Sequence, residues 1–141
     1  MKMYKTLFSA LILSGVTMVS QAGVAVVVGA SSPLAGSTMS EDDVNKIFLG
    51  KAKDHNGVQV VPVDQNEGAA ARDDFYTNVI KKSEAQLKSY WSRLIFTGKG
   101  QAPQVVGSDA DVKGMVASNP NLVGYISEGA VDGSVKVLYK Q

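Results

Sequence analysis

The segment from residue 60 to residue 75 has the arrangement of residue types best suited to a chemical task. An apolar strand over residues 58–63 runs into the polar turn Asp64-Gln65-Asn66-Glu67. Gly68 and three alanines then open an amphipathic helix, with apolar positions at Phe75, Tyr76, Val79 and Ile80. A helix that begins in this way leaves its first backbone N–H groups unpaired, at the positive end of its dipole. The segment therefore predicts a binding site for a small oxyanion.

Polar side chains at strand ends are expected around the same site. Ligands of α/β sheets collect at the carboxyl ends of strands, where Asp64 and Gln65 follow one predicted strand and Ser31 and Ser32 follow another. Arg72 lies in the first turn of the helix, where it could contact the anion or pair with Asp73, Asp43 or solvent. The predicted ligand-binding residues are Ser31, Ser32, Asp64, Gln65, Gly68, Ala69, Ala70, Ala71 and Arg72.

A structural role is the alternative for all of these residues. Three alanines stand where a dedicated anion pocket usually has hydroxyl groups. Residues 68–71 are also small enough for a tight connection between a strand and a helix, which would make the pocket a relic. Serines before a proline, such as Ser32 before Pro33, commonly form turns without binding anything.

No catalytic or metal-binding pattern is visible. His55 is the single histidine and lies in a polar loop, and the chain has no cysteine, so thiolate metal sites and a Ser-His-Asp arrangement have little support. Thr97-Gly98-Lys99-Gly100 lacks the spacing of a phosphate-binding loop. We therefore expect no metal, no cofactor and no enzymatic activity; a hydrolase that uses His55 or Ser32 is the weakest alternative.

The N-terminus has the pattern of a cleavable signal peptide. Lys2 and Lys5 precede an apolar run over residues 7–19, and Ser20-Gln21-Ala22 offers small residues before Gly23. The run is shorter than the ~20 residues that span a bilayer, so we do not expect an integral membrane protein. The prediction is a signal peptide at 1–22 and a domain at 23–141 that is exported to the periplasm, with secretion beyond an outer membrane as the alternative.

The charge of the predicted domain argues against nucleic acid as a partner. Removing residues 1–22 leaves 141 − 22 = 119 residues and removes Lys2 and Lys5, so the formal charge is 12 − 13 = −1. Nucleic-acid-binding domains usually have a basic surplus.

The remaining pattern predicts strands that alternate with helices. Residues 24–29 are continuously apolar and β-branched, as in a strand buried on both faces. Ser40, Ser83 and Ser108 are expected to cap helices, and Gln86 completes a capping box with Ser83. Residues 122–127 and 135–139 predict two further strands. This order indicates an α/β fold with helices covering one sheet.

Three segments of the chain follow one another in the order IFLGKAKDHNG, VVPVDQNEGAAARDDFY and VASNPNLVGYISEGAVDGSVKVLY. In this order they resemble segments of the phosphate-type (PstS-like) substrate-binding proteins of ABC transporters. The family has an IFxGK segment, an RxxGSGTRxxF turn and helix, and an xxNPxAIGY strand. The resemblance implies one lobe of a type II periplasmic-binding-protein-like fold, with a mixed, mostly parallel sheet flanked by helices.

The chain departs from the family at the residues that hold phosphate. The arginine of the family motif falls at Gln65, and its serine, second glycine and threonine fall at Ala69, Ala70 and Ala71. Losing one charge-assisted hydrogen bond costs about 1.5–3 kcal/mol. Family members are two-lobed clamps of about twice this length, so the resemblance implies an open, weak site.

The leading hypothesis is a periplasmic solute-binding module that binds a small oxyanion, phosphate first, and serves a membrane permease. The alternative is a protein-interaction module of an envelope assembly, in which a relic anion pocket remains and another envelope protein covers the apolar face of the lobe.

Overall fold

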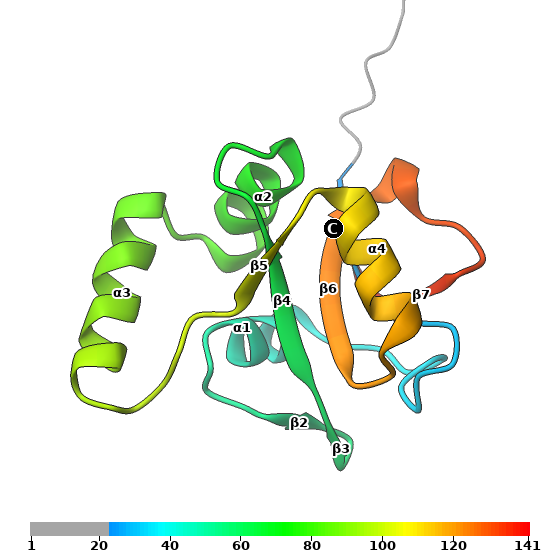
Figure 1. Cartoon of the computed structure of the whole chain (residues 1–141), viewed down its shortest axis with the longest axis horizontal. Coiled ribbons are helices and arrows are strands. Elements are labelled where there is room, and N and C mark those ends of the chain that lie inside the picture. Colours follow the sequence, from blue (N-terminus) through cyan, green and yellow to red (C-terminus); the bar gives the residue numbers. More distant parts are fainter. Residues whose placement is uncertain (1–22) are drawn as a thin grey trace, which may run out of the picture.

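A five-stranded sheet forms the centre of the molecule, with the strand order β5-β4-β6-β1-β7 (Figure 1). The computed structural model describes residues 23–141, so the predicted signal peptide, residues 1–22, lies outside the described residues. The strands of the sheet are β1 (Val24–Gly29), β4 (Val61–Gln65), β5 (Gln104–Gly107), β6 (Leu122–Ser127) and β7 (Val135–Lys140).

The strand directions confirm the predicted α/β class with a mixed, mostly parallel sheet. β4 pairs in parallel with β5 and with β6, whereas β1 pairs antiparallel with β6 and with β7. Four of the five strands therefore run in one direction and only β1 runs against them. Because of this direction, the loop after β1 lies at the opposite end of the strands from the loops after β4 and β6.

Helices cover both faces of the sheet, which explains the continuous apolar sequence of β1. The helices are α1 (Glu41–Phe48), α2 (Ala70–Phe75), α3 (Glu84–Phe96) and α4 (Asp109–Ser118). One face of β1 packs in a core cluster with helices α1, α2 and α3 through Val24, Val26 and Val28. The other face packs against helix α4 through Ala25 and Val27. Side chains of a strand alternate between the faces, so both sets must be apolar.

Three serine caps begin helices where the sequence predicts them. Ser40 and Asp43 form a reciprocal capping box at α1, and Ser83 and Gln86 form another at α3. Ser108 begins α4, where its N–H and its hydroxyl group both donate to the Asp111 carboxylate. Each box satisfies backbone donors that the first turn cannot satisfy itself.

The structure differs from the prediction at three elements. The predicted strand over residues 58–63 is divided: β3 (Val58–Gln59) pairs with β2 (Asp54–His55) as a hairpin, and β4 begins at Val61. β5 was not predicted, because four residues at the edge of a sheet carry too little periodicity. The helix after Gly68 turns π-helical in η1 (Tyr76–Ile80) and ends at Lys81, which is left-handed.

α3 extends away from the sheet, at the left of the view in Figure 1. It is anchored by the buried side chains of Leu87 and Trp91. At its far end Ile95 is 56% exposed and Phe96 is 92% exposed. The helix therefore presents apolar side chains that no part of residues 23–141 covers.

Within residues 23–141 no helix is both long enough and apolar enough to pass through a bilayer. The same residues contain no group of three or more histidine and acidic side chains arranged to hold a metal ion.

Candidate functional site

The turn between β4 and α2 depends on a glycine. The backbone of Gly68 has φ +90°, a left-handed conformation that residues with a Cβ rarely adopt. The Ala69 N–H donates to the Asn66 carbonyl at 3.1 Å, which closes the turn. The chain thus reverses direction within four residues and presents the start of α2 beside the end of β4.

The first turn of α2 has backbone donors without acceptors. Ala69 is the N-cap residue and has no side-chain oxygen to accept from the turn. The Asp73 N–H donates to the Ala69 carbonyl, but among residues 23–141 the N–H groups of Ala70, Ala71 and Arg72 have no acceptor. Ala70 is exposed, so its N–H is open to water or to an external anion, whereas Ala71 is 5% exposed.

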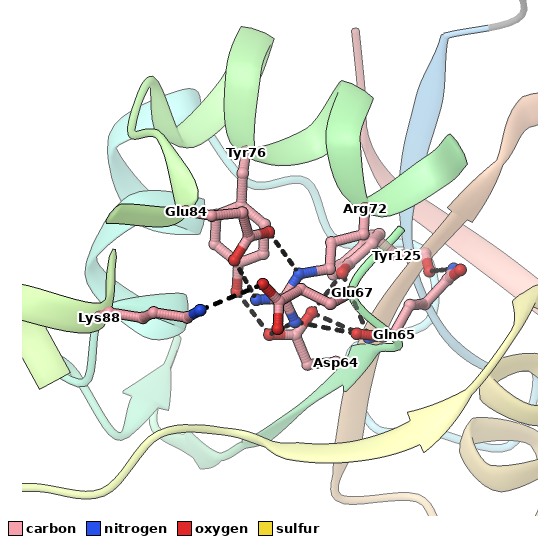
Figure 2. A network of polar contacts seen from close by, with 8 residues as sticks. All are labelled: Asp64, Gln65, Glu67, Arg72, Tyr76, Glu84, Lys88 and Tyr125. Atoms are coloured by element: carbon pink, nitrogen blue, oxygen red, sulfur yellow. Dashed lines mark hydrogen bonds and ion pairs between the residues drawn. The ribbon is translucent and has the colours of Figure 1, made fainter. Parts of the chain in front are cut away.

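Asp64, at the end of β4, is the centre of a buried polar network (Figure 2). Its side chain is 6% exposed. One carboxylate oxygen accepts from the hydroxyl of Tyr125 and, at 2.8 Å, from the Gln65 N–H. The other accepts from the Tyr76 hydroxyl at 2.6 Å and lies 3.2 Å from Nη1 of Arg72. The carboxylate is therefore satisfied from inside the protein.

The two tyrosines of this network are held in the protonated, donating form. Burial raises the pKa of Tyr76, and the nearby Asp64 carboxylate raises it further. Burial and Asp64 likewise raise the pKa of Tyr125. Phe75 stacks on Tyr125 with ring centroids 4.0 Å apart, which attaches the network to the core.

Gln65 lies beside the turn, but its side chain points inward. It is 1% exposed, and its Nε2 donates to the Tyr125 carbonyl and to Asp109 Oδ1, each at 2.8 Å. The same Asp109 oxygen accepts from the Ser127 N–H at 3.1 Å. Gln65 therefore ties β4 to β6 and to the start of α4, and it offers no donor to an external ligand.

The Arg72 guanidinium is also engaged within the protein. Nε and Nη2 donate to the two carboxylate oxygens of Glu84 at 2.8 and 2.9 Å. Nη1 donates to the Gln65 carbonyl at 2.9 Å, and the guanidinium lies 5.0 Å from the centre of the Tyr76 ring. The alternatives of pairing with Asp73 or Asp43 are wrong, because the side chain turns back toward β4 and α3.

The charges of this pair stabilise one another. Burial by itself lowers the pKa of Arg72, but the hydrogen bonds to Glu84 and the charge of Asp64 reverse this effect and raise it. The hydrogen bonds from Arg72 lower the pKa of Glu84. Both side chains are therefore ionised at neutral pH.

Ser31 and Ser32 lie far from the turn between β4 and α2. Val24, at the start of β1, pairs with Ser127 at the end of β6, so β1 ends beside the start of β6, at the opposite end of the strands. Ser32 is 6% exposed, and its hydroxyl oxygen accepts from the Leu34 N–H at 3.1 Å. The prediction that these serines face the anion site is wrong because it assumed that β1 runs parallel to β4.

Sequence reasoning missed four residues of the network: Tyr76, Glu84, Asp109 and Tyr125. Tyr76 and Tyr125 look like core residues of a helix and a strand, and Glu84 looks like part of a capping motif. Asp64 and Tyr125 are 61 positions apart, and Gln65 and Asp109 are 44 apart. No local pattern links residues at such separations.

No protein-family model and no curated protein matches the chain. Solved structures do match its fold. A protein of Clostridium perfringens, described as a phosphate ABC transporter substrate-binding protein with bound phosphate, is 24% identical, with a TM-score of 0.64. An ABC-type phosphate transport receptor of Vibrio cholerae is 22% identical (TM-score 0.63), and PstS of Borrelia burgdorferi is 16% identical (TM-score 0.55).

The matches include most of this chain but only part of the other proteins. They cover 82% of this chain and 44%, 45% and 46% of those three chains, respectively. The predicted resemblance is thus confirmed at the level of the fold. The chain spans less than half the length of these phosphate-type substrate-binding proteins and has the fold of that part of them.

Proposed function

We propose that the chain is a solute-binding module, without enzymatic activity, that binds a small oxyanion, phosphate first, at the start of α2. The observation that carries this proposal is the set of free N–H groups of Ala70, Ala71 and Arg72, next to a turn that Gly68 closes. Backbone donors that converge at the positive end of a helix suit an anion. Phosphate comes first because the Clostridium perfringens protein of the same fold has phosphate bound.

The site we propose relies on backbone groups rather than side chains. Ala69 and Ala71 have no hydroxyl groups, and the Gln65 side chain is used internally. Arg72 contributes its backbone N–H and positive charge, while its guanidinium is engaged with Glu84 and Asp64. We therefore expect affinity in the millimolar range, well below that of a site in which charged side chains also contact the ligand.

The biological setting we propose is export and transfer. The chain would enter the periplasm with its signal peptide removed and pass its ligand to a membrane permease, as the description of similar structures as ABC transport proteins suggests. Because the chain spans less than half of those proteins, a partner would have to supply the second wall of a closed site.

Titration with inorganic phosphate tests the site, with Ala70→Pro as the deciding variant. Proline is favoured at the first helical position and removes one N–H donor there. The residue before it, Ala69, already has the extended conformation that proline requires, with φ −66 and ψ 136. We expect calorimetry at low ionic strength to show saturable binding that Ala70→Pro weakens about tenfold, since one hydrogen bond to a charged group is worth ~1.5–3 kcal/mol.

The matched control is Glu41→Pro, which places proline at the first position of α1, away from the site. It should leave phosphate affinity unchanged. Flat titrations for the unmodified protein, or equal weakening by both prolines, would contradict the proposal.

A second candidate function is protein interaction within an envelope assembly. The observation in its favour is the apolar end of α3, where Phe96 is 92% exposed and Ile95 is 56% exposed. A protein that covers this end should co-purify with the chain and be lost with Phe96→Ser. A monomer without a partner would count against this function.

A further inference from the structure

Arg72 is bound by a carboxylate in the geometry in which arginine binds oxyanions. Nε and Nη2 donate in parallel to Oε1 and Oε2 of Glu84 at 2.8 and 2.9 Å (Figure 2). Carboxylates and phosphates both present two oxygens to this fork of the guanidinium. An external oxyanion could therefore make the same two hydrogen bonds that Glu84 makes.

Glu84 is the replaceable partner of Arg72. Its side chain is 33% exposed, whereas the Asp64 side chain, the other acidic partner, is 6% exposed and also accepts from Tyr76 and Tyr125. Water and solutes can reach the Glu84 carboxylate from the surface. Removing Asp64 would instead leave two buried hydroxyl groups without their acceptor.

The start of α3 does not require Glu84 to contact Arg72. The capping box there is made by Ser83 and Gln86, and it is complete without the Glu84 side chain. α3 is also attached through Leu87 and Trp91, so the helix has anchors besides this ion pair. The Glu84 carboxylate can leave the guanidinium while these contacts remain.

Arg72 also lies at the proposed ligand site. It is the third residue of α2, and its own N–H is one of the three free donors there. An oxyanion that reaches this guanidinium meets a fork that Glu84 already fills. Because Glu84 is part of the same chain, it competes at a high effective concentration.

We propose that Glu84 is an internal ligand of Arg72, and that an oxyanion must displace it to bind with full affinity. This inference rests on the proposed oxyanion site at the start of α2. Competition from Glu84 then lowers the affinity of the site for every oxyanion. It also favours ligands with two oxygens that can replace the carboxylate on the guanidinium. In an empty site Glu84 keeps Nε and Nη2 of this largely buried arginine paired, while Nη1 stays with Asp64 and the Gln65 carbonyl.

Phosphate titration of Glu84→Gln tests this inference. Gln retains the size of the side chain but removes the negative charge, so we expect phosphate to bind at least about tenfold more tightly than to the unmodified protein. Glu67→Gln is the matched control: it makes the same change of charge on a nearby carboxylate that pairs with Lys88 at 3.5 Å rather than with Arg72. Because Glu67 directly precedes Gly68, its loss of charge should raise the affinity through electrostatics alone, and by less than Glu84→Gln does. If Glu84→Gln does not fold, as circular dichroism would show, Glu84→Ala replaces it.

The outcomes separate this inference from the proposed function. Equal affinity of the unmodified protein and the Glu84 variant, or an equal gain in the Glu67 variant, would overturn the inference and leave the oxyanion site in place. Absence of binding to both the unmodified protein and the Glu84 variant would overturn both. A gain that is clearly larger in the Glu84 variant than in the Glu67 variant would support the displacement.

Discussion

At the scale of single residues, the candidate site is organised by charges that the protein itself satisfies. Asp64 accepts from two tyrosines and a backbone N–H, and Arg72 donates to Glu84 and to the Gln65 carbonyl. Such networks are stable only when every member is paired. The groups left free for a ligand are therefore backbone donors, which explains why the side-chain chemistry of the turn looks so sparse in the sequence.

Asp64→Asn should destabilise the fold strongly. The amide keeps the shape of the side chain but places an NH₂ group where a tyrosine hydroxyl or Arg72 now donates, and breaking a buried ion pair costs about 3–5 kcal/mol. The free energy of unfolding in urea should fall by roughly 3 kcal/mol. Asp42→Asn is the control, since Asp42 pairs with Lys46 at the surface with its side chain 71% exposed. Similar losses in the two variants would show that the network adds little.

The Arg72–Glu84 pair should make stability depend on pH in the acid range. The pKa of Glu84 is lower in the folded protein than its ordinary value of 4.5, chiefly through its hydrogen bonds with Arg72. The contribution of the pair is therefore complete above about pH 4.5 and is lost as the pH falls through the lower folded pKa.

Urea unfolding on both sides of this range should show the effect. Glu84→Gln should be less stable than the unmodified protein at neutral pH, and the difference should shrink in acid. Glu67→Gln is the comparison variant, since Glu67 pairs with Lys88 rather than with Arg72. A constant difference for Glu84→Gln at every pH would contradict the assignment.

At the scale of elements, close approach between backbones positions the sheet and its helices. A Cβ at Gly29 would collide with the Val116 carbonyl oxygen of α4, so this glycine lets β1 and α4 pack closely. Gly114 lies in α4 with nothing within 4 Å of a Cβ built there. One glycine is thus required by packing, and the other is open to replacement.

Alanine substitutions at these two glycines should have opposite effects. Gly29→Ala must push α4 away from β1 and should cost about 1–3 kcal/mol or more. Gly114→Ala should add about 0.5–1 kcal/mol, because glycine is unfavourable within a helix. Thermal or urea denaturation of the pair gives the comparison, and a change of the same sign in both would contradict this account of the packing.

At the scale of the whole molecule, residues 23–141 form a central five-stranded sheet with helices on both faces, and they leave the apolar end of α3 uncovered. It spans 44% of the Clostridium perfringens protein that shares its fold. An anion at the start of α2 would therefore meet one wall, unless a partner provides another. Among the described residues, Phe96 at the end of α3 is the large apolar side chain with the highest exposed fraction, 92%.

Two phenylalanine substitutions should separate surface from core. Phe96→Ala should change the free energy of unfolding by less than about 0.5 kcal/mol, because Phe96 is 92% exposed. Phe48→Ala should cost about 3–5 kcal/mol, because Phe48 is fully buried and packs edge-on against both Phe75 and Tyr125. Equal losses would show that the end of α3 is packed in solution, for example by self-association, which sedimentation velocity would detect.

The sequence by itself determined the parts of this protein that depend on near neighbours. The continuous apolar run of residues 24–29, the serine caps of α1, α3 and α4, and the glycine turn after β4 are all local signals, and the structure has each of them. Capping boxes act across three residues and a left-handed turn needs one glycine, so both can be seen in the sequence.

Only the tertiary structure decided which of the candidate residues share a site. Because β1 runs antiparallel to β6, Ser31 and Ser32 lie at the opposite end of the strands from the turn after β4. An apolar run does not encode the direction of its strand. Tyr125 is 61 positions from Asp64 and Asp109 is 44 from Gln65, and these partners meet because the sheet brings β4, β6 and the start of α4 together. Whether Arg72 faces a ligand or Glu84 depends on the placement of α3, which is set by packing rather than by local sequence.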